Sequence, residues 1–259
     1  QRRFIDIVRA CVALDRRELL MLIAERAQVD PELRDERGDT FLHALVRLEG
    51  AMGREMDEDM GIEPPRSITL LVPLLLDSIC RSQPLMSLFA TNSEGFTALY
   101  IADRKSQCAA VVFSALYRSL EHHVVNIVLH KREERQLLPN AYALSLGLEK
   151  KFAGLRTQIL PISSMNDGEE GCPGSFEVIL EAPEWMRSRV LYSKLDSGVL
   201  PVVADVTRTL MQQMFGHGVS KVELSQLEAW CTAGLKAAAK CDRRGRKGAG
   251  QARSAMRRN

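Results

Sequence analysis

One short phrase occurs twice in this chain, as DERGDTFLH at residues 35–43 and as NSEGFTALY at residues 92–100. Both copies read Asp or Asn, two residues, Gly, one residue, Thr, one residue, Leu. The glycine suits a tight turn that needs a positive φ, and the threonine suits the N-cap of a helix. His43 follows Thr40 by three residues, so we expect it to support the cap and to pack. Each copy predicts a tight turn followed by a capped short helix.

Apolar residues with helical spacing surround both phrases. Residues 4–14 and 15–26 read as helices before the first copy, and residues 107–118 read as a helix after the second. Each unit is therefore a turn, a short helix and a longer helix. Such a pair cannot bury its apolar face alone, so the sequence predicts that copies stack on one another.

The two phrases resemble the ankyrin repeat family, whose consensus is Asp/Asn-x-x-Gly-x-Thr-Pro-Leu-His-x-Ala. The residues that carry the resemblance are Asp35, Gly38, Thr40, Leu42 and His43 in the first copy, and Asn92, Gly95, Thr97, Leu99 and Ala102 in the second. Phe41 and Ala98 replace the proline, Tyr100 replaces the second histidine, and Ala44 lies one place early. The resemblance implies a mainly α fold, an ankyrin-like stack of helix-turn-helix repeats.

The expected repeat domain covers residues 1–160, with about four degenerate repeats and a third turn near residues 139–148. The two turn glycines, Gly38 and Gly95, are 57 residues apart. An ankyrin period is about 33 residues, so we expect an acidic, Met-rich loop inserted at residues 49–66. A smaller excess after Gly95 predicts that the second helix of that repeat is extended through residues 121–130.

The resemblance stops beyond residue 160. Residues 161–174 read as a linker, and residues 175–240 as a C-terminal α or small α+β extension of unknown family. In that extension we expect a strand at residues 175–181 and helices at residues 202–215 and 225–240. Ser225 and Glu228 form a candidate capping box for the last helix.

Positive charge is concentrated at the end of the chain. The whole chain has a net charge of +2, but residues 240–259 hold eight Lys or Arg and one Asp, so the rest is mildly acidic. We expect residues 241–259 to form a disordered tail that contacts nucleic acid or an anionic surface weakly, nonspecifically and in a salt-sensitive way. The candidate polyanion-binding residues are Arg243, Arg244, Arg246, Lys247, Arg257 and Arg258.

Several functional classes find no support in the sequence. The longest apolar run, residues 68–76, is too short to cross a bilayer, so we expect no transmembrane segment. No metal-ligand spacing, phosphate-binding glycine pattern or catalytic constellation is present, so we expect no cofactor and no enzyme activity. The six cysteines are scattered, which favours free thiols in a reducing compartment, the cytoplasm or the nucleus. The chain opens on Gln1, which predicts an excerpt of a longer protein.

The resemblance implies a protein–protein interaction module or scaffold, which binds through its concave face and turn tips. The candidate partner-binding residues, which flank the turn glycines, are Glu36, Arg37, Asp39, Ser93, Glu94 and Phe96. Two alternatives stay open. One is a regulatory or targeting arm of a larger enzyme, and the other is weak polyanion binding through the basic tail.

Overall fold

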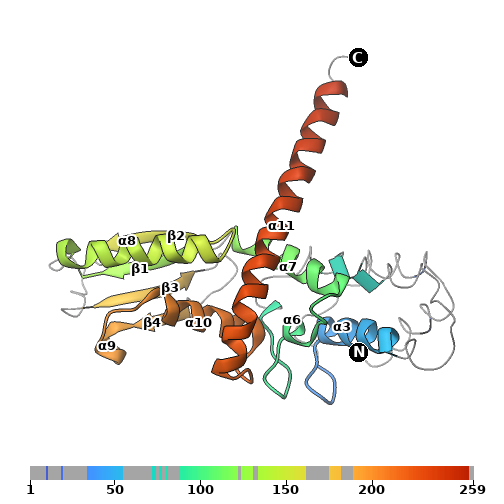
Figure 1. The fold of residues 1–259 in the computed structure, drawn as a ribbon, viewed down its shortest axis with the longest axis horizontal. Helices are drawn as coiled ribbons and strands as arrows, with labels where there is room; N and C mark the ends of the chain where they lie inside the picture. The colour runs from blue at the N-terminus through green and yellow to red at the C-terminus, as the bar shows by residue number, and fades with distance from the viewer. Residues whose placement is uncertain are drawn as a thin grey trace. The chain divides into compact units, whose positions relative to one another are not determined.

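The computed structural model describes residues 34–54, 88–121, 124–130, 134–161, 175–181 and 189–256, and the single positions 10, 19, 72, 73, 76, 77 and 80. The chain forms two compact units (Figure 1). Unit 1 comprises Gln1–Leu116 and Met211–Leu224, and unit 2 comprises Tyr117–Leu210 and Ser225–Asn259. This division differs from the predicted boundary at residue 160, because each unit takes segments from both halves of the chain.

Unit 2 is built on a four-stranded mixed sheet with the strand order β2-β1-β3-β4. The strands are β1 (Val124–Leu129), β2 (Arg156–Pro161), β3 (Phe176–Glu181) and β4 (Arg189–Ser193). β1 and β2 are parallel, whereas β1–β3 and β3–β4 are antiparallel. A parallel pair needs a crossover connection, which here is helix α8 (Glu134–Lys151).

This sheet overturns the prediction of a mainly α ankyrin-like stack, because the fold is α/β. The segment predicted as an extended helix, residues 121–130, contains the central strand β1. Val124, Val125, Ile127 and Val128 are β-branched, and such side chains favour a strand over a helix. Because a central strand is covered on both faces, residues 125–129 of β1 are all buried, Asn126 included, and the strand shows no alternation of apolar and polar residues that would reveal it.

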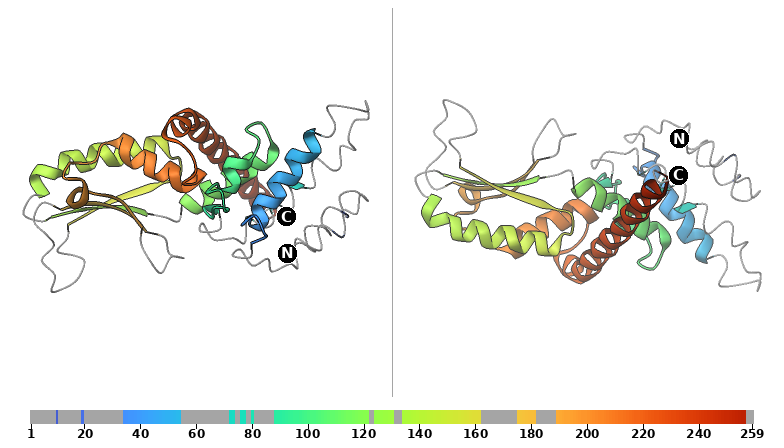
Figure 2. Two further views of the ribbon diagram at one scale, coloured as in Figure 1. Left: turned by 90° about the horizontal axis from the view of Figure 1, so that it is seen from below. Right: turned by 90° about the horizontal axis from the view of Figure 1, so that it is seen from above.

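The predicted third repeat, at residues 139–148, is also wrong. These residues lie inside α8, which buries Leu137, Ala141, Leu144 and Leu148 along one face. α8 and α10 (Val203–Phe215) lie on the same face of the sheet (Figure 2). The two helices approach closely at Gly147: a Cβ atom added there would lie only 2.5 Å from Val203 Cγ2.

Two of the elements predicted in the C-terminal extension are confirmed. The strand predicted at residues 175–181 is β3, with Phe176, Val178 and Leu180 buried on one side. The helix predicted at residues 202–215 is α10. A short helix, α9 (Lys194–Ser197), follows β4 and ends at Gly198 in the left-handed conformation. Of the predicted linker, only Pro161 is described, as the last residue of β2.

Unit 1 contains α3 (Phe41–Arg54), α6 (Ala98–Ile101) and the first part of α7 (Gln107–Leu120). α3 extends into the segment predicted as an inserted loop at residues 49–66, and residues 55–66 lie outside the described ranges. The helices predicted at residues 4–14 and 15–26 also lie outside them, apart from one position in each. The helix predicted at residues 107–118 is confirmed as α7.

The last helix, α11 (Lys221–Met256), is longer than predicted at both ends. It begins four residues before Ser225, and it continues through the segment predicted as a disordered tail. Residues 225–240 therefore lie inside a helix whose start is set elsewhere. No helix within the described ranges is long and apolar enough to span a membrane.

Candidate functional site

The first repeated phrase forms a turn that is closed by Asp35. The Asp35 Oδ1 atom accepts the backbone N–H groups of Arg37 at 2.9 Å and of Asp39 at 2.8 Å. The backbone adds a hydrogen bond from Gly38 N–H to Asp35 C=O at 2.9 Å. Gly38 has a φ of +70°, a conformation that glycine adopts without strain. The tight turn predicted at this glycine is confirmed.

The second phrase repeats this arrangement atom for atom. The Asn92 Oδ1 atom accepts the backbone N–H groups of Glu94 at 3.1 Å and of Phe96 at 3.0 Å. Gly95 N–H donates to Asn92 C=O at 3.0 Å, and Gly95 has a φ of +82°. Asp and Asn are both found at the first position because each offers a side-chain oxygen to two turn amides.

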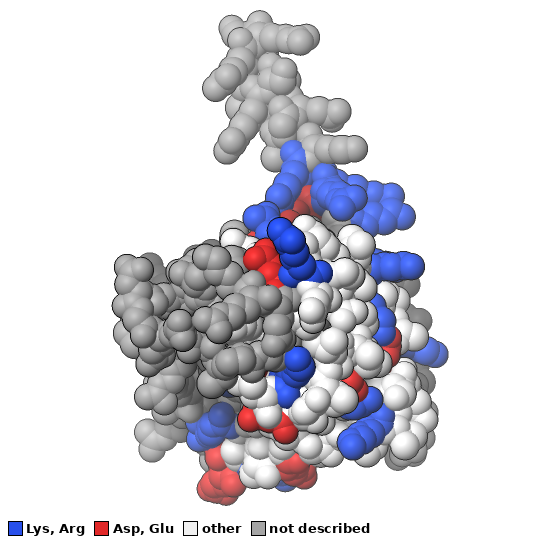
Figure 3. Space-filling view, turned by 90° about the vertical axis from the view of Figure 1, so that its left-hand side faces the viewer, with Lys and Arg blue, Asp and Glu red and all other residues white. Residues whose placement is uncertain are grey.

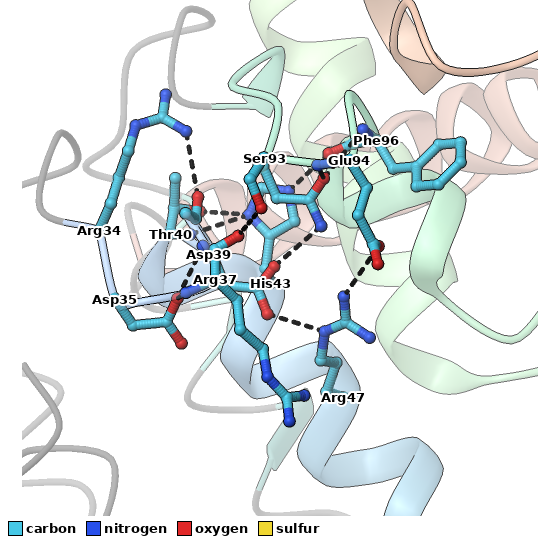
Figure 4. A network of polar contacts seen from close by, with 12 residues as sticks. Arg34, Asp35, Arg37, Asp39, Thr40, His43, Arg47, Ser93, Glu94 and Phe96 are labelled. Atoms are coloured by element: carbon cyan, nitrogen blue, oxygen red, sulfur yellow. Dashed lines mark hydrogen bonds and ion pairs between the residues drawn. The ribbon is translucent and has the colours of Figure 1, made fainter.

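The two turns lie side by side, as Figure 4 shows. Ser93 N–H donates to Arg37 C=O at 3.2 Å, and the Ser93 hydroxyl donates to the same carbonyl. The Arg34 guanidinium donates to Gly38 C=O at 3.1 Å and also to Thr91 C=O. A Cβ at Gly38 would lie only 2.7 Å from Ser93 N, so this close approach requires glycine.

His43 joins the first helix cap to the second turn. Its Nδ1 atom lies 2.7 Å from Thr40 Oγ1 and accepts Thr40 N–H at 3.1 Å, while Nε2 lies 2.9 Å from Phe96 O. A carbonyl oxygen only accepts, so Nε2 carries the proton and the ring is neutral. Burial is the main cause that lowers the pKa of His43, opposed by the bond to Phe96. The expected capping and packing role of His43 is confirmed.

Asp39, a candidate partner-binding residue, is buried rather than exposed at the tip, with 3% of its surface accessible. Its Oδ1 atom accepts from Asn92 Nδ2 at 3.0 Å, and its Oδ2 atom accepts from Arg47 Nε at 2.8 Å. A buried carboxylate without these partners would destabilise unit 1 strongly. Asp39 therefore links the two turns to α3, and the prediction that it faces a partner is wrong.

A third turn, residues 215–220, stacks on the second within unit 1. Thr97 N–H donates to Phe215 C=O, and Gly218 N–H donates to Gly95 C=O, both at 3.1 Å. Gly216 has a φ of +109°, and a Cβ there would overlap Gly95 O. This turn was not predicted from the sequence. A signal was present, because Gly218 lies two residues before the capping Ser220, just as Gly38 and Gly95 each lie two residues before a capping Thr.

The third turn ends in the capping box of α11. The Ser220 hydroxyl lies 2.7 Å from the Glu223 carboxylate, Ser220 N–H donates to Glu223 at 3.0 Å, and Glu223 N–H donates to Ser220 Oγ at 3.3 Å. Hydrogen bonds from Ser220 lower the pKa of Glu223. Tyr100 adds a contact from α6, with its hydroxyl 3.3 Å from Glu223 Oε1.

The other candidate partner-binding residues lie at the first two turns. Glu36, Arg37, Ser93 and Glu94 are exposed. The Glu94 carboxylate lies 3.7 Å from the Arg47 guanidinium, so it borders the buried Asp39 pair. Phe96 is half-buried and stacks on Tyr100 with ring centroids 4.4 Å apart. The structure therefore brings five of the six candidates together as one surface of adjacent tips.

The candidate polyanion-binding residues belong to unit 2. Arg243 and Arg244 are exposed on α11, whereas Arg246 pairs with Glu121 and Asp242, each at 2.6 Å. Lys247 lies in α11, but its side chain is not among those described. Arg257 and Arg258 lie beyond the described residues.

Neither unit shows a metal centre in its described part, since no three His, Cys, Asp or Glu side chains gather there. Cys80, Cys108 and Cys231 are buried and form no disulfide bond, and burial raises the pKa of Cys231 to about 12. A thiol with a raised pKa is a weak nucleophile, because the thiolate is the reactive form. These three cysteines behave as core residues.

No protein-family model, no curated protein and no solved structure matches this chain.

Proposed function

We propose that unit 1 is a protein-binding module that recognises its partner through the tips of the first two turns. The observation that carries the proposal is the duplicated turn, in which Asp35 and Asn92 satisfy the turn amides from within. The tip side chains of Glu36, Arg37 and Glu94 are left on the surface. The resemblance of both phrases to ankyrin turns supports the same role.

Rigidity is what makes such tips suitable for binding. Each turn holds a positive-φ glycine, and Ser93 and Arg34 join the two turns to each other. A surface that is ordered before binding loses less conformational entropy when the partner docks. Both acidic side chains (Glu36 and Glu94) and a basic side chain (Arg37) lie at the tips, so we expect a partner with a complementary mixed-charge surface.

Site-specific photo-crosslinking tests this proposal. A photoreactive amino acid replaces Arg37 or Glu94 in the full chain, and replaces exposed Tyr142 on α8 as the matched control. We expect the two tip positions to yield the same protein adduct and the control position not to yield it. A crosslink to another part of the same polypeptide would instead favour a regulatory arm of a larger enzyme.

Affinity for the purified adduct protein then provides the second measurement. The charge swap Glu36→Arg with Arg37→Glu should weaken binding at least about tenfold, which is the loss of a few tip contacts. The control swap Lys150→Glu with Asp196→Lys, on exposed positions of unit 2, keeps the same net charge and should leave affinity unchanged. Equal effects of both swaps would refute binding through the tips.

The compartment belongs to this proposal as well. The buried cysteines Cys80, Cys108 and Cys231, which form no disulfide bond, support a reducing environment, the cytoplasm or the nucleus.

A further inference from the structure

A cavity of about 380 Å³ lies in unit 2 between α11 and the turn that follows α8. Its lining residues are Ala153, Lys236, Ala239, Lys240, Arg243 and Arg244. Four of the six carry a positive charge, and the two alanines form its uncharged part. The cavity therefore has the electrostatic character of an anion site.

The four cations share one side of α11. Lys240, Arg243 and Arg244 follow Lys236 by four, seven and eight residues, which places all four on one helical face. Over eight residues of α11 the positive stripe is about 12 Å long. Figure 3 shows Lys and Arg side chains gathered in the upper part of the view, where the described side chains of α11 end.

Among the described residues, the four lining cations have no carboxylate partner, unlike several basic residues near them in unit 2. Arg246 pairs with Glu121, and Lys151 pairs with Glu228 at 2.5 Å. In the described part of the chain, none of the four lining cations forms an ion pair with a carboxylate. Like charges four residues apart on a helix repel each other, so the stripe is most stable when an external anion neutralises it.

The composition of the lining selects among anions. Arginine offers a planar fork that binds phosphate with two hydrogen bonds, and lysine offers a point charge. Among the described residues, no aromatic side chain lines the cavity, so they provide no platform on which a base could stack. Among the described residues, none of the large exposed apolar side chains comes from residues 225–246, although a membrane-binding face would need them.

We propose that the cavity formed by Lys236, Lys240, Arg243 and Arg244 binds the phosphate backbone of a nucleic acid without reading its sequence. The site belongs to unit 2 and does not depend on the partner surface proposed for unit 1. It also differs from the basic tail predicted from the sequence, because Lys236 and Lys240 precede that tail and α11 holds all four residues in a helix.

Titration of a fluorescent duplex of about 20 base pairs with the full chain tests this site at salt concentrations from about 50 to about 200 mM. The double variant Lys240→Gln with Arg243→Gln should raise the Kd about tenfold. The slope of log Kd against log salt should fall by about 1.8, since each phosphate neutralised contributes about 0.9. The double variant Arg135→Gln with Lys150→Gln removes the same charge from exposed positions of α8 and should change the Kd less than about twofold.

Further variants distinguish this site from the terminal arginines and from a loss of folding. Arg243→Lys with Arg244→Lys keeps the charge and should retain most of the binding, and circular dichroism verifies that each variant is folded. Arg253→Gln with Arg257→Gln and Arg258→Gln should retain the same slope. The proposal would be overturned if this tail variant lost all binding, or if both glutamine double variants lost equal amounts of affinity. Tighter binding to phosphatidylserine vesicles than to the duplex would also overturn it.

Discussion

The neutral, buried His43 ring makes the stability of unit 1 sensitive to acid. Protonation would place a hydrogen on Nδ1, which already accepts from Thr40. Because the pKa is lowered below 6.5 in the folded state, the unfolded chain takes up this proton first as the pH falls. The free energy of unfolding should therefore be constant above about pH 7.5 and should decrease as the pH falls through 6.5 toward the lowered pKa.

Urea unfolding at about pH 7.5, 6.5 and 5.5 measures this dependence. His43→Gln should be less stable than the wild type at every pH, and its stability should decline less between the highest and the lowest pH. The exposed His217 offers the control, because His217→Gln should keep the wild-type decline. A decline in His43→Gln as steep as that of the wild type would show that other groups cause it.

At the turns, the sequence predicted the role of a residue only where its contacts are with residues close to it in the chain. The turn glycines and the Thr40–His43 contact depend on residues a few positions apart, and the sequence predicted them correctly. Asp39 was misplaced because one of its partners, Asn92, lies 53 residues away. A single sequence does not reveal that two turns will stack and bury a tip carboxylate between them.

At the scale of elements, the start of α11 gives a direct comparison of two capping boxes. Ser220→Ala should destabilise the protein by about 0.5–2 kcal/mol, because the first turn of α11 loses its cap. Ser225→Ala, at the position predicted from sequence, should change stability by less than about 0.5 kcal/mol, since it lies inside the helix. Denaturant midpoints of both variants measure the difference, and a larger effect at Ser225 would contradict the observed helix start.

The sequence could not decide between these two boxes, because both have a Ser three residues before a Glu. What distinguishes Ser220 is the turn before it, whose Gly218 bonds to Gly95 of the second turn. The helical spacing of α7 and α10, in contrast, was sufficient to predict them. The α/β class was missed for a similar reason, since β1, with five apolar residues and Asn126, is too short for its sequence to separate a buried strand from a helix.

At the scale of the whole molecule, both units depend on the end of the chain. Met211–Leu224 belongs to unit 1, and Ser225–Asn259 belongs to unit 2. The buried apolar residues of these segments include Met214, Phe215, Leu227, Cys231 and Leu235. A chain ending at Leu210 should therefore lose protection in both units, with amide hydrogen exchange at least about tenfold faster in α3 and in β1.

A chain ending at Lys240 provides the control for this truncation. It keeps every buried apolar residue named above, so exchange in α3 and β1 should stay close to that of the full chain. If the amides of α3 stay protected from hydrogen exchange in the chain that ends at Leu210, unit 1 does not need its C-terminal segment.

The stacked turns also set an order of events during synthesis on the ribosome. The second turn is finished when Thr97 is added, but the backbone groups that it bonds in the third turn, at Phe215 and Gly218, are made about 120 residues later. At about 5–20 residues per second this interval lasts roughly 6–24 s. Until then the Gly95 carbonyl and the Thr97 amide lack these backbone partners. Unit 2 starts within the same interval, so its sheet strands are translated while unit 1 is still incomplete.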